Sequence, residues 1–271
     1  MRRHPRGHLR FFYKAATVPA IGYPLLLCWQ KGWLPRPRGE VRARLHDGRI
    51  LRCQLSDRTQ RTMYFDLFEP AETRLITTLL GPGDSFIDVG AHIGWFTTLA
   101  ARQVGRSGQV LACEPYPSNA AALKENLDLN DVPNVRVVEA ALGSRPGTLG
   151  LARGGGDSGG VTALDWAKDG RVDVPMTTLD EAAAGMPAVT LMKLDVEGWE
   201  AQVLSGASRT LLRTRSVLIE INAPALRKAG SSAEELFGLL RRSGFSTFVP
   251  LSQTGLRRLH RSDVTNVLAG R

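Results

Sequence analysis

The 271-residue sequence has few cysteines, no internal repeats and no long apolar run. Its three cysteines, Cys28, Cys53 and Cys113, share no CxxC or other metal-ligand spacing. This excludes a disulfide framework and favours a reducing compartment, so we expect a cytoplasmic protein. The longest apolar stretch, residues 15–29, is interrupted by two prolines and a glycine. It is too short and too broken for a membrane-spanning helix, which needs about 20 apolar residues.

Net basic charge is missing from most of the chain, although the whole sequence carries +9. Residues 1–61 hold twelve Arg and two Lys against three acids, a net charge of +11. The remaining residues hold 21 basic and 23 acidic side chains, a net charge of −2. A nucleic-acid-binding enzyme is expected to carry its positive potential over the active face. We therefore do not predict nucleic acid as a partner.

Residues 1–39 form a basic and apolar N-terminal arm, for which two interpretations stay open. In the first, broken helices pack their apolar side on the rest of the protein. In the second, the arm is an interfacial anchor, with basic residues facing anionic headgroups and Trp29 and Trp33 at the boundary. The second interpretation predicts peripheral membrane association through residues 1–34.

The pattern of residues 40–80 predicts a hairpin with its turn at Asp47-Gly48, followed by a helix over residues 64–80. We expect these two elements to form a cap that leads into the main domain. Strands and helices then alternate. The predicted strands cover residues 85–89, 109–114, 135–139, 189–195, 215–221, 244–249 and 264–268, with a further strand at 171–176 outside this set. The predicted helices cover residues 94–104, 117–130, 199–212 and 231–243. This alternation predicts an α/β domain over 81–271, with a doubly wound, mostly parallel sheet of seven strands.

The most informative segment starts at Asp88, where a predicted strand ends and a glycine turn leads into a helix. Gly90 and Gly94 allow the backbone to approach a ligand closely. Glu114 ends the next predicted strand, where it can accept hydrogen bonds from both hydroxyls of a ribose. The spacing Gly90-x-x-x-Gly94 differs from the Gly-x-Gly-x-x-Gly pattern that binds a dinucleotide pyrophosphate. S-adenosylmethionine therefore fits better than a nicotinamide dinucleotide, and an ordinary tight turn with a stray acid is the structural alternative.

A second segment carries three charges at the end of a predicted buried strand: Lys193, Asp195 and Glu197, before a turn at Gly198. Burying charged groups is costly unless they pair or serve a ligand. One interpretation is a Lys193–Asp195 ion pair, with Glu197 capping the next helix. The other places Asp195 beside a methyl-donor pocket, with Asp195 or Glu197 as the general base.

Taken together, these segments resemble the FkbM-type methyltransferase family. The resemblance rests on Phe86–Gly94, Glu114-Pro115 and Met192–Glu200, and it covers about residues 64–222. It implies a class I, Rossmann-like methyltransferase fold that binds S-adenosylmethionine. It also implies O-methylation of sugar or natural-product hydroxyl groups.

The resemblance also implies roles for individual residues. The candidate donor-binding set is Asp88, Gly90, Ala91, His92, Gly94, Glu114, Pro115, Ala141 and Asp195, and the candidate catalytic residues are Asp195, Glu197 and His92. It assigns Asp88 to the methionine end of the donor and Glu114 to the ribose. The family commonly has Asn where this chain has His92. The role of His92 therefore stays open between donor positioning and a base near the acceptor.

We expect an S-adenosylmethionine-dependent enzyme that methylates a hydroxyl group on a sugar, a polyketide or a lipid-linked glycan. The alternatives are an N- or nucleic-acid methyltransferase and a donor-binding module without turnover. Glu220 and Asn222 are further candidates on the acceptor side, and the glycine-rich residues 153–160 are a candidate lid. No metal site is predicted, because Asp195 and Glu197 lack a third oxygen ligand with clear spacing; metal dependence and oligomeric state are left open.

Overall fold

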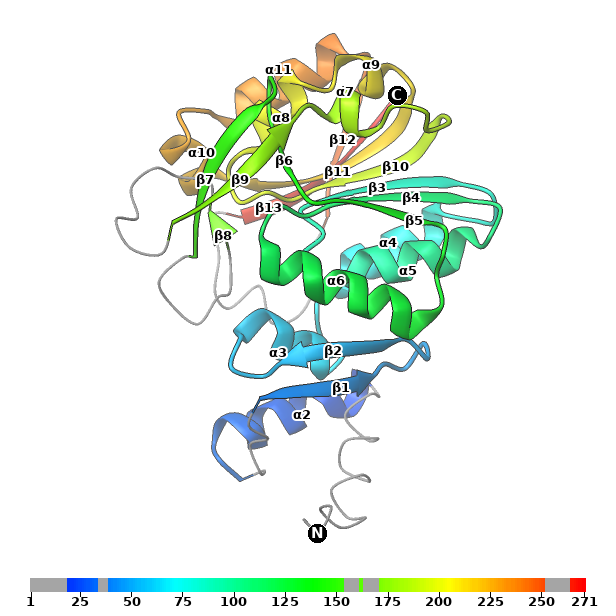
Figure 1. Ribbon diagram of the computed structural model, residues 1–271, viewed down its shortest axis with the longest axis vertical. Helices are drawn as coiled ribbons and strands as arrows, with labels where there is room; N and C mark the ends of the chain where they lie inside the picture. Colours follow the sequence, from blue (N-terminus) through cyan, green and yellow to red (C-terminus); the bar gives the residue numbers. More distant parts are fainter. Residues whose placement is uncertain (1–18, 34–38, 154–160, 163–170, 252–263) are drawn as a thin grey trace. The chain divides into compact units, whose positions relative to one another are not determined.

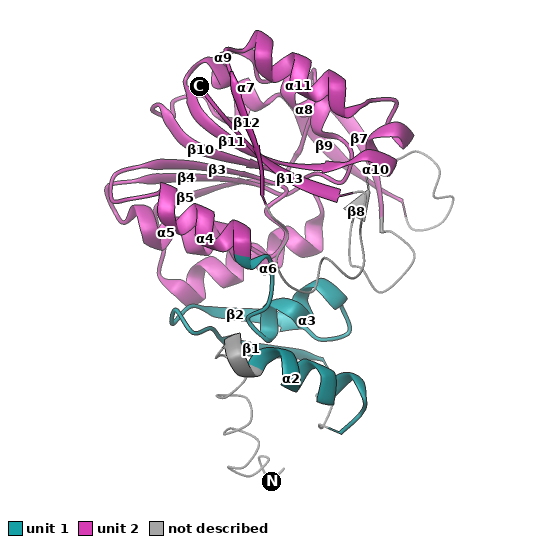
Figure 2. Ribbon diagram, turned by 180° about the vertical axis from the view of Figure 1, so that it is seen from behind, with its two compact units in different colours: residues 1–70, 155–159 teal, residues 71–154, 160–271 magenta. Residues whose placement is uncertain are grey.

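A computed structural model describes residues 19–33, 39–153, 161–162, 171–251 and 264–271 (Figure 1). The chain divides into two compact units, coloured separately in Figure 2. The first takes in the described residues up to Pro70, and the second takes in those from Ala71 onward. Residues 154–160, which make up nearly all of the candidate lid, lie outside the described part of the chain.

The first unit contains a helix, a hairpin and a short second helix. Its elements are α2 (Pro19–Gln30), β1 (Glu40–Arg44), β2 (Ile50–Gln54) and α3 (Arg58–Tyr64). β1 and β2 pair antiparallel, which confirms the predicted hairpin. The single helix predicted over residues 64–80 is wrong, because the chain breaks between α3 and a new helix at Pro70. Asp66 and Glu69 have φ angles of 58° and 42°, which an α-helix excludes.

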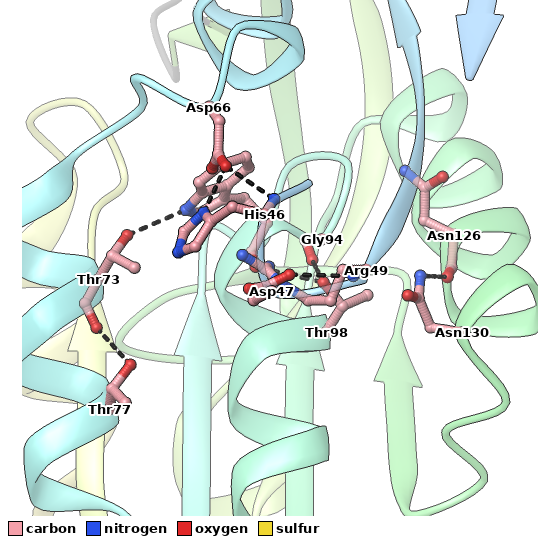
Figure 3. Close-up of polar contacts among 11 residues, drawn as sticks. His46, Asp47, Arg49, Asp66, Thr73, Thr77, Gly94, Thr98, Asn126 and Asn130 are labelled. Carbon is pink, nitrogen blue, oxygen red and sulfur yellow. Dashed lines mark hydrogen bonds and ion pairs between the residues drawn. The ribbon is translucent and has the colours of Figure 1, made fainter. Parts of the chain in front are cut away.

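Side-chain contacts stabilise two turns of the first unit, the hairpin turn between β1 and β2 and the turn after α3 (Figure 3). In the hairpin turn, the Asp47 carboxylate accepts hydrogen bonds from the backbone nitrogen of Arg49 at 2.9 Å and from its Nε at 2.7 Å. The backbone nitrogen of His46 donates to Asp66 Oδ2 at 2.9 Å, and the His46 ring contacts the same oxygen. The contact ties the hairpin to the turn that ends α3.

The second unit is built on a seven-stranded sheet with the order β12-β13-β11-β10-β3-β4-β5. Its strands are β3 (Ser85–Val89), β4 (Gln109–Cys113), β5 (Val135–Val138), β10 (Val189–Leu194), β11 (Thr214–Asn222), β12 (Thr247–Pro250) and β13 (Val264–Gly270). Only β13 runs antiparallel to its neighbours. This order with one reversed strand is the class I methyltransferase topology, and it confirms the predicted doubly wound sheet.

Helices cover both faces of this sheet (Figure 1). α4 (Pro70–Leu79), α5 (Trp95–Val104) and α6 (Pro117–Asn130) lie on one face, and α7 (Leu179–Ala182), α8 (Glu200–Ser205), α9 (Ser208–Leu212) and α11 (Ala233–Arg242) lie on the other. The short α10 (Ala223–Lys228) follows β11. The single helix predicted over 199–212 is wrong, because it divides at Gly206. There the chain passes so close to Gly143 that a Cβ on Gly206 would lie 2.0 Å from the Gly143 carbonyl oxygen.

A second, four-stranded sheet was not predicted apart from one of its strands. It has the order β6-β9-β7-β8, with β6 (Ala141–Leu142), β7 (Gly147–Arg153), β8 (Val161–Thr162) and β9 (Val172–Thr177). Ala141, Leu151 and Val174 form its small buried core. Two of its strands are only two residues long, so they leave no alternating pattern in the sequence.

Candidate functional site

The candidate residues meet at the point where the strand order of the large sheet reverses. From β3 the chain moves outward to β4 and β5, whereas β10, the other neighbour of β3, leads to β11 in the opposite direction. Such a switch point leaves a crevice beyond the carboxyl ends of the two central strands. Asp88 lies near the end of β3, and Asp195 directly follows β10. The structure therefore brings together two acids that are more than a hundred positions apart.

Asp88 is a buried carboxylate, only 1% exposed. Its Oδ2 accepts a hydrogen bond from Thr97 Oγ1 at 2.6 Å, whereas its Oδ1 has no hydrogen-bond partner among the described residues. Burial raises the pKa of Asp88, and the ammonium of Lys193 and the hydrogen bond from Thr97 partly oppose this rise. A buried acceptor without a donor is costly, so this oxygen is suited to a ligand that supplies one.

Lys193 supplies the positive charge of the site. It is paired in register with Asp88 across the β3–β10 ladder and is almost fully buried. Its Nζ donates to Asp195 Oδ2 at 2.7 Å and lies 4.9 Å from the centre of the Phe96 ring. The Lys193–Asp195 pair predicted as the structural interpretation is thus present. The ammonium charge of Lys193 acts on both Asp88 and Asp195.

The turn after β3 is shaped by close contact with the neighbouring loop. Gly90 has a φ of 85°, and a Cβ placed there would lie 1.9 Å from the backbone carbonyl oxygen of Asp195. At Gly94, with a φ of 89°, a Cβ would lie 2.6 Å from Leu123 Cδ1. Contacts within the protein are therefore enough to require glycine at both positions, whether or not a ligand also approaches the turn. Their absent side chains allow the turn to pack on α6 and on the loop after β10.

His92 occupies the middle of this turn with a φ of 51°. Left-handed backbone is uncommon for residues other than glycine, but Asn, Asp and His adopt it more readily than most. The backbone conformation at this position therefore accommodates His as readily as the Asn that the resemblance leads us to expect. The backbone nitrogen of His92 donates to Glu114 Oε2 at 2.8 Å, which links the turn to the end of β4. These contacts are consistent with a positioning role.

Glu114 is held by three donors. Besides the bond from His92, its Oε1 accepts from the backbone nitrogen of Tyr116 at 2.9 Å and from Asn119 Nδ2 at 3.4 Å. Burial raises the pKa of Glu114 to about 7, although these hydrogen bonds act in the opposite direction. The carboxylate is fixed in place at the end of β4, next to the turn that carries His92.

The loop after β10 is organised by Glu200, which sequence reasoning did not select. Glu200 is fully buried, and its Oε1 accepts hydrogen bonds from the backbone nitrogens of Val196 and Gly198, both at 3.1 Å. Burial raises the pKa of Glu200 to about 7. Glu197 has a φ of 53°, and Gly198 has a φ of 105°. Glu200, not Glu197, is the acid in the first turn of α8, so the expected capping role of Glu197 is wrong.

The remaining candidates have more varied positions. Glu220 on β11 is buried, with a carboxylate oxygen within 4.8 Å of one of Asp195. Asn222 caps α10 by accepting a hydrogen bond from the backbone nitrogen of Ala225 at 3.2 Å, which is a structural role. Ala141 lies in the second sheet, where it pairs with Met176.

Tyr116 packs against the core of the second sheet, to which Ala141 belongs. Pro115 lies between Tyr116 and the buried Glu114. The second sheet therefore adjoins the segment that follows β4. Thr97, the partner of Asp88, is another contributor that sequence reasoning missed; the available signal was a hydroxyl residue in the first turn of the helix that leaves the glycine turn.

Comparisons with known proteins point to one family. A family model described as a methyltransferase FkbM domain matches residues 88–247. The 2-O-methyltransferase NoeI of Sinorhizobium fredii is 26% identical over 187 residues, which span 62% of this chain and 75% of that protein. Methyltransferase sdnD of Sordaria araneosa is 28% identical over 179 residues, covering 53% of this chain and 69% of its own length.

Among solved structures, TYW2 of M. jannaschii in complex with AdoMet is similar with a TM-score of 0.48 and 12% sequence identity. That similarity covers 88% of this chain and 87% of the other. A putative rRNA methylase of Clostridium thermocellum has a TM-score of 0.46 with 12% identity, over 73% of this chain and 94% of the other.

Proposed function

The chain belongs to the FkbM methyltransferase family, and from this premise we propose that it transfers a methyl group from S-adenosylmethionine to a hydroxyl oxygen. The acceptor class that we propose is a sugar, a polyketide or a lipid-linked glycan. Similarity to a protein named a 2-O-methyltransferase supports oxygen as the methylated atom. The net charge of −2 over residues 62–271 supports a small-molecule or glycan acceptor rather than a nucleic acid.

The observation that carries this proposal is the buried Asp88 oxygen without a donor, set beside a second buried carboxylate at the end of the next strand. Asp88 would receive a donor group from the methionine end of the ligand. Glu114 would hold the ribose hydroxyls, since an acid at the end of the strand after the glycine turn is placed for that contact. Gly90, Ala91 and His92 would line the turn between these two acids.

S-adenosylmethionine, when bound, supplies an electrophilic methyl group on a sulfonium. The protein's task is then chiefly alignment, because well-oriented reactants gain about 7–11 kcal/mol over free encounter. The acceptor hydroxyl must also lose its proton as its oxygen attacks, and a positioned base contributes about 10²–10⁴-fold. Asp195 and Glu197 follow β10 at the crevice and are our candidates for this base.

The contacts of these two acids differ. Asp195 shares its Oδ2 with the Lys193 ammonium, so an acceptor hydroxyl would compete with that ammonium for this oxygen. Lys193 thereby fixes the orientation of the Asp195 carboxylate. Glu197 has a left-handed backbone conformation. It lies between Val196 and Gly198, whose backbone nitrogens both donate hydrogen bonds to Glu200. Strained backbone of this kind clusters at functional sites. We assign His92 to donor positioning through its backbone contact with Glu114.

Two measurements test the proposal. Calorimetry with S-adenosylhomocysteine and with NAD should show binding of the former alone. Transfer of labelled methyl groups should then be measured with a panel of free sugars, polyketides and glycolipids, with and without a chelator of divalent cations. Absence of affinity for both S-adenosylmethionine and S-adenosylhomocysteine would overturn the assignment. Binding without transfer to any hydroxyl acceptor, but with transfer to an amine, would move the reaction to nitrogen.

A further inference from the structure

Exposed apolar side chains are concentrated in one short stretch of the first unit. Among the described residues, the exposed large hydrophobic side chains are Tyr23, Leu27, Trp33, Leu212 and Val249. Three of these five lie between positions 23 and 33. Trp33 is 71% exposed, although an indole is among the side chains that gain most from leaving water. Grouped exposed apolar residues mark an interaction surface more often than scattered ones do.

Helix α2 has two apolar faces, and only one is used within the first unit. Leu26 and Trp29 are buried, and the Arg61 guanidinium lies 4.8 Å from the centre of the Trp29 ring. Tyr23 and Leu27 are four residues apart, so they share the other face of the helix. One apolar face of α2 is therefore buried and the other is exposed.

Basic side chains are exposed beside Trp33 and elsewhere in the first unit. Lys31 is exposed, and its Nζ lies 4.8 Å from the centre of the Trp33 ring. Arg42 and Arg44 on β1 are exposed in the same unit. Residues 1–61 carry a net charge of +11. Apolar and aromatic side chains among basic ones are the composition of surfaces that bind at the headgroup level of anionic membranes.

We propose that the outward face of α2 and the turn after it, formed by Tyr23, Leu27, Lys31 and Trp33, docks on an anionic lipid surface. No helix within the described ranges is long and apolar enough to cross a bilayer. The apolar side chains enter the headgroup boundary, and the basic residues hold the anionic headgroups. The proposal is independent of the methyl-transfer reaction, because it rests on the first unit alone.

The test is flotation of the full-length protein with vesicles of phosphatidylcholine, with and without phosphatidylglycerol. We expect binding to the anionic vesicles that falls as salt is raised, because charges at the surface are screened. Replacing both Leu27 and Trp33 by Ser should lower the partition coefficient by about tenfold or more, as two apolar side chains no longer leave water. Lys31→Glu should weaken binding at low salt.

The control is Leu212→Ser, which removes an exposed leucine from the second unit; Leu212 is 69% exposed, against 38% for Leu27. This variant should float like the unaltered protein. Because all these side chains are exposed, thermal midpoints should be retained, and circular dichroism checks the fold. Equal flotation of the Leu27/Trp33 double variant and the unaltered protein would overturn the proposal. So would a protein that ignores the vesicles but sediments as a dimer that the double variant dissociates, since a second copy would then cover this face.

Discussion

Replacing Gly90 by Ala should damage both stability and donor binding, because the turn after β3 presses on the loop after β10. The new Cβ would lie 1.9 Å from the Asp195 carbonyl oxygen, well inside any allowed contact. The position also has a φ of 85°, where a residue with a Cβ costs about 1–2 kcal/mol. Relief of the clash requires a backbone shift, and overpacking of this kind adds about 1–3 kcal/mol. We expect a total loss of about 2–5 kcal/mol.

Gly185→Ala is the matched control for this variant. Gly185 has a φ of 79°, but a Cβ there would meet no atom within 4 Å. It therefore carries the backbone cost alone, about 1–2 kcal/mol. The difference between the two variants isolates the contact with Asp195. Thermal unfolding should place the Gly90 variant several degrees below the control, since about 2–4 °C accompanies each kcal/mol in a protein of this size.

The second readout is affinity for S-adenosylhomocysteine by calorimetry. The Gly185 variant should bind like the unaltered protein, because its turn lies outside the switch point. The Gly90 variant should bind at least tenfold more weakly when measured below its unfolding temperature, since the shifted turn displaces His92 from Glu114. Equal midpoints and equal affinities for the two variants would refute the proposed packing of the turn against Asp195.

Four further predictions follow from the site. Asp88→Asn keeps an acceptor for the hydrogen bond from Thr97 but removes the charge of the side chain. It should weaken S-adenosylhomocysteine binding by about 10–100-fold in calorimetry, because that is the loss in affinity expected when a hydrogen bond to a charged group is lost. Asp195→Asn should keep that affinity but lower kcat by about 10²–10⁴-fold if Asp195 is the base; an unchanged kcat would leave Glu197 as the candidate. His92→Asn should preserve the melting temperature and donor affinity, whereas His92→Val should lower both, since a β-branched residue at this φ is strained. Burial raises the pKa of Glu200 from 4.5 to about 7, so the folded state holds that proton longer than the unfolded state, and Glu200 alone should lower the free energy of unfolding by about 3 kcal/mol between about pH 4.5 and 7. Burial raises the pKa of Glu114 to about 7 as well, so Glu200→Gln should remove only the Glu200 share of the slope in urea titrations, whereas the exposed control Glu125→Gln should leave the slope unchanged.

The sequence predicted the large sheet because its strands are buried on both faces and appear as continuous apolar runs between helices. It also located Asp88, Glu114 and Asp195, because each is an acid at the end of such a run. Another acid of the region, Glu200, escaped selection because it lies at a helix start and its hydrogen bonds among the described residues come from backbone nitrogens. Contacts with the backbone leave no pattern of residue types in the sequence.

The two breaks in the predicted helices differ in their sequence signal. The apolar spacing across residues 64–80 is compatible with one helix, but Pro70 disfavours helical backbone in the residue before it and is typical of a helix start, so the sequence carried a signal for this break. The segment after Trp199 ends at Gly206, where the chain passes so close to Gly143 that a Cβ would lie 2.0 Å from the Gly143 carbonyl oxygen. That tertiary contact leaves no local pattern.

The turn after β3 and the loop after β10 pack directly on each other, so a movement of one must move the other. Asp195 donates its backbone hydrogen bond to the Val89 carbonyl oxygen at 3.1 Å, just before Gly90 meets the Asp195 carbonyl. A displacement of the donor turn must therefore move the backbone that carries Asp195, and the reverse also holds. In-line transfer depends on alignment between donor and base. Under the proposed function, direct contact between these loops would set the alignment of donor and base through the backbone, whichever acid accepts the proton.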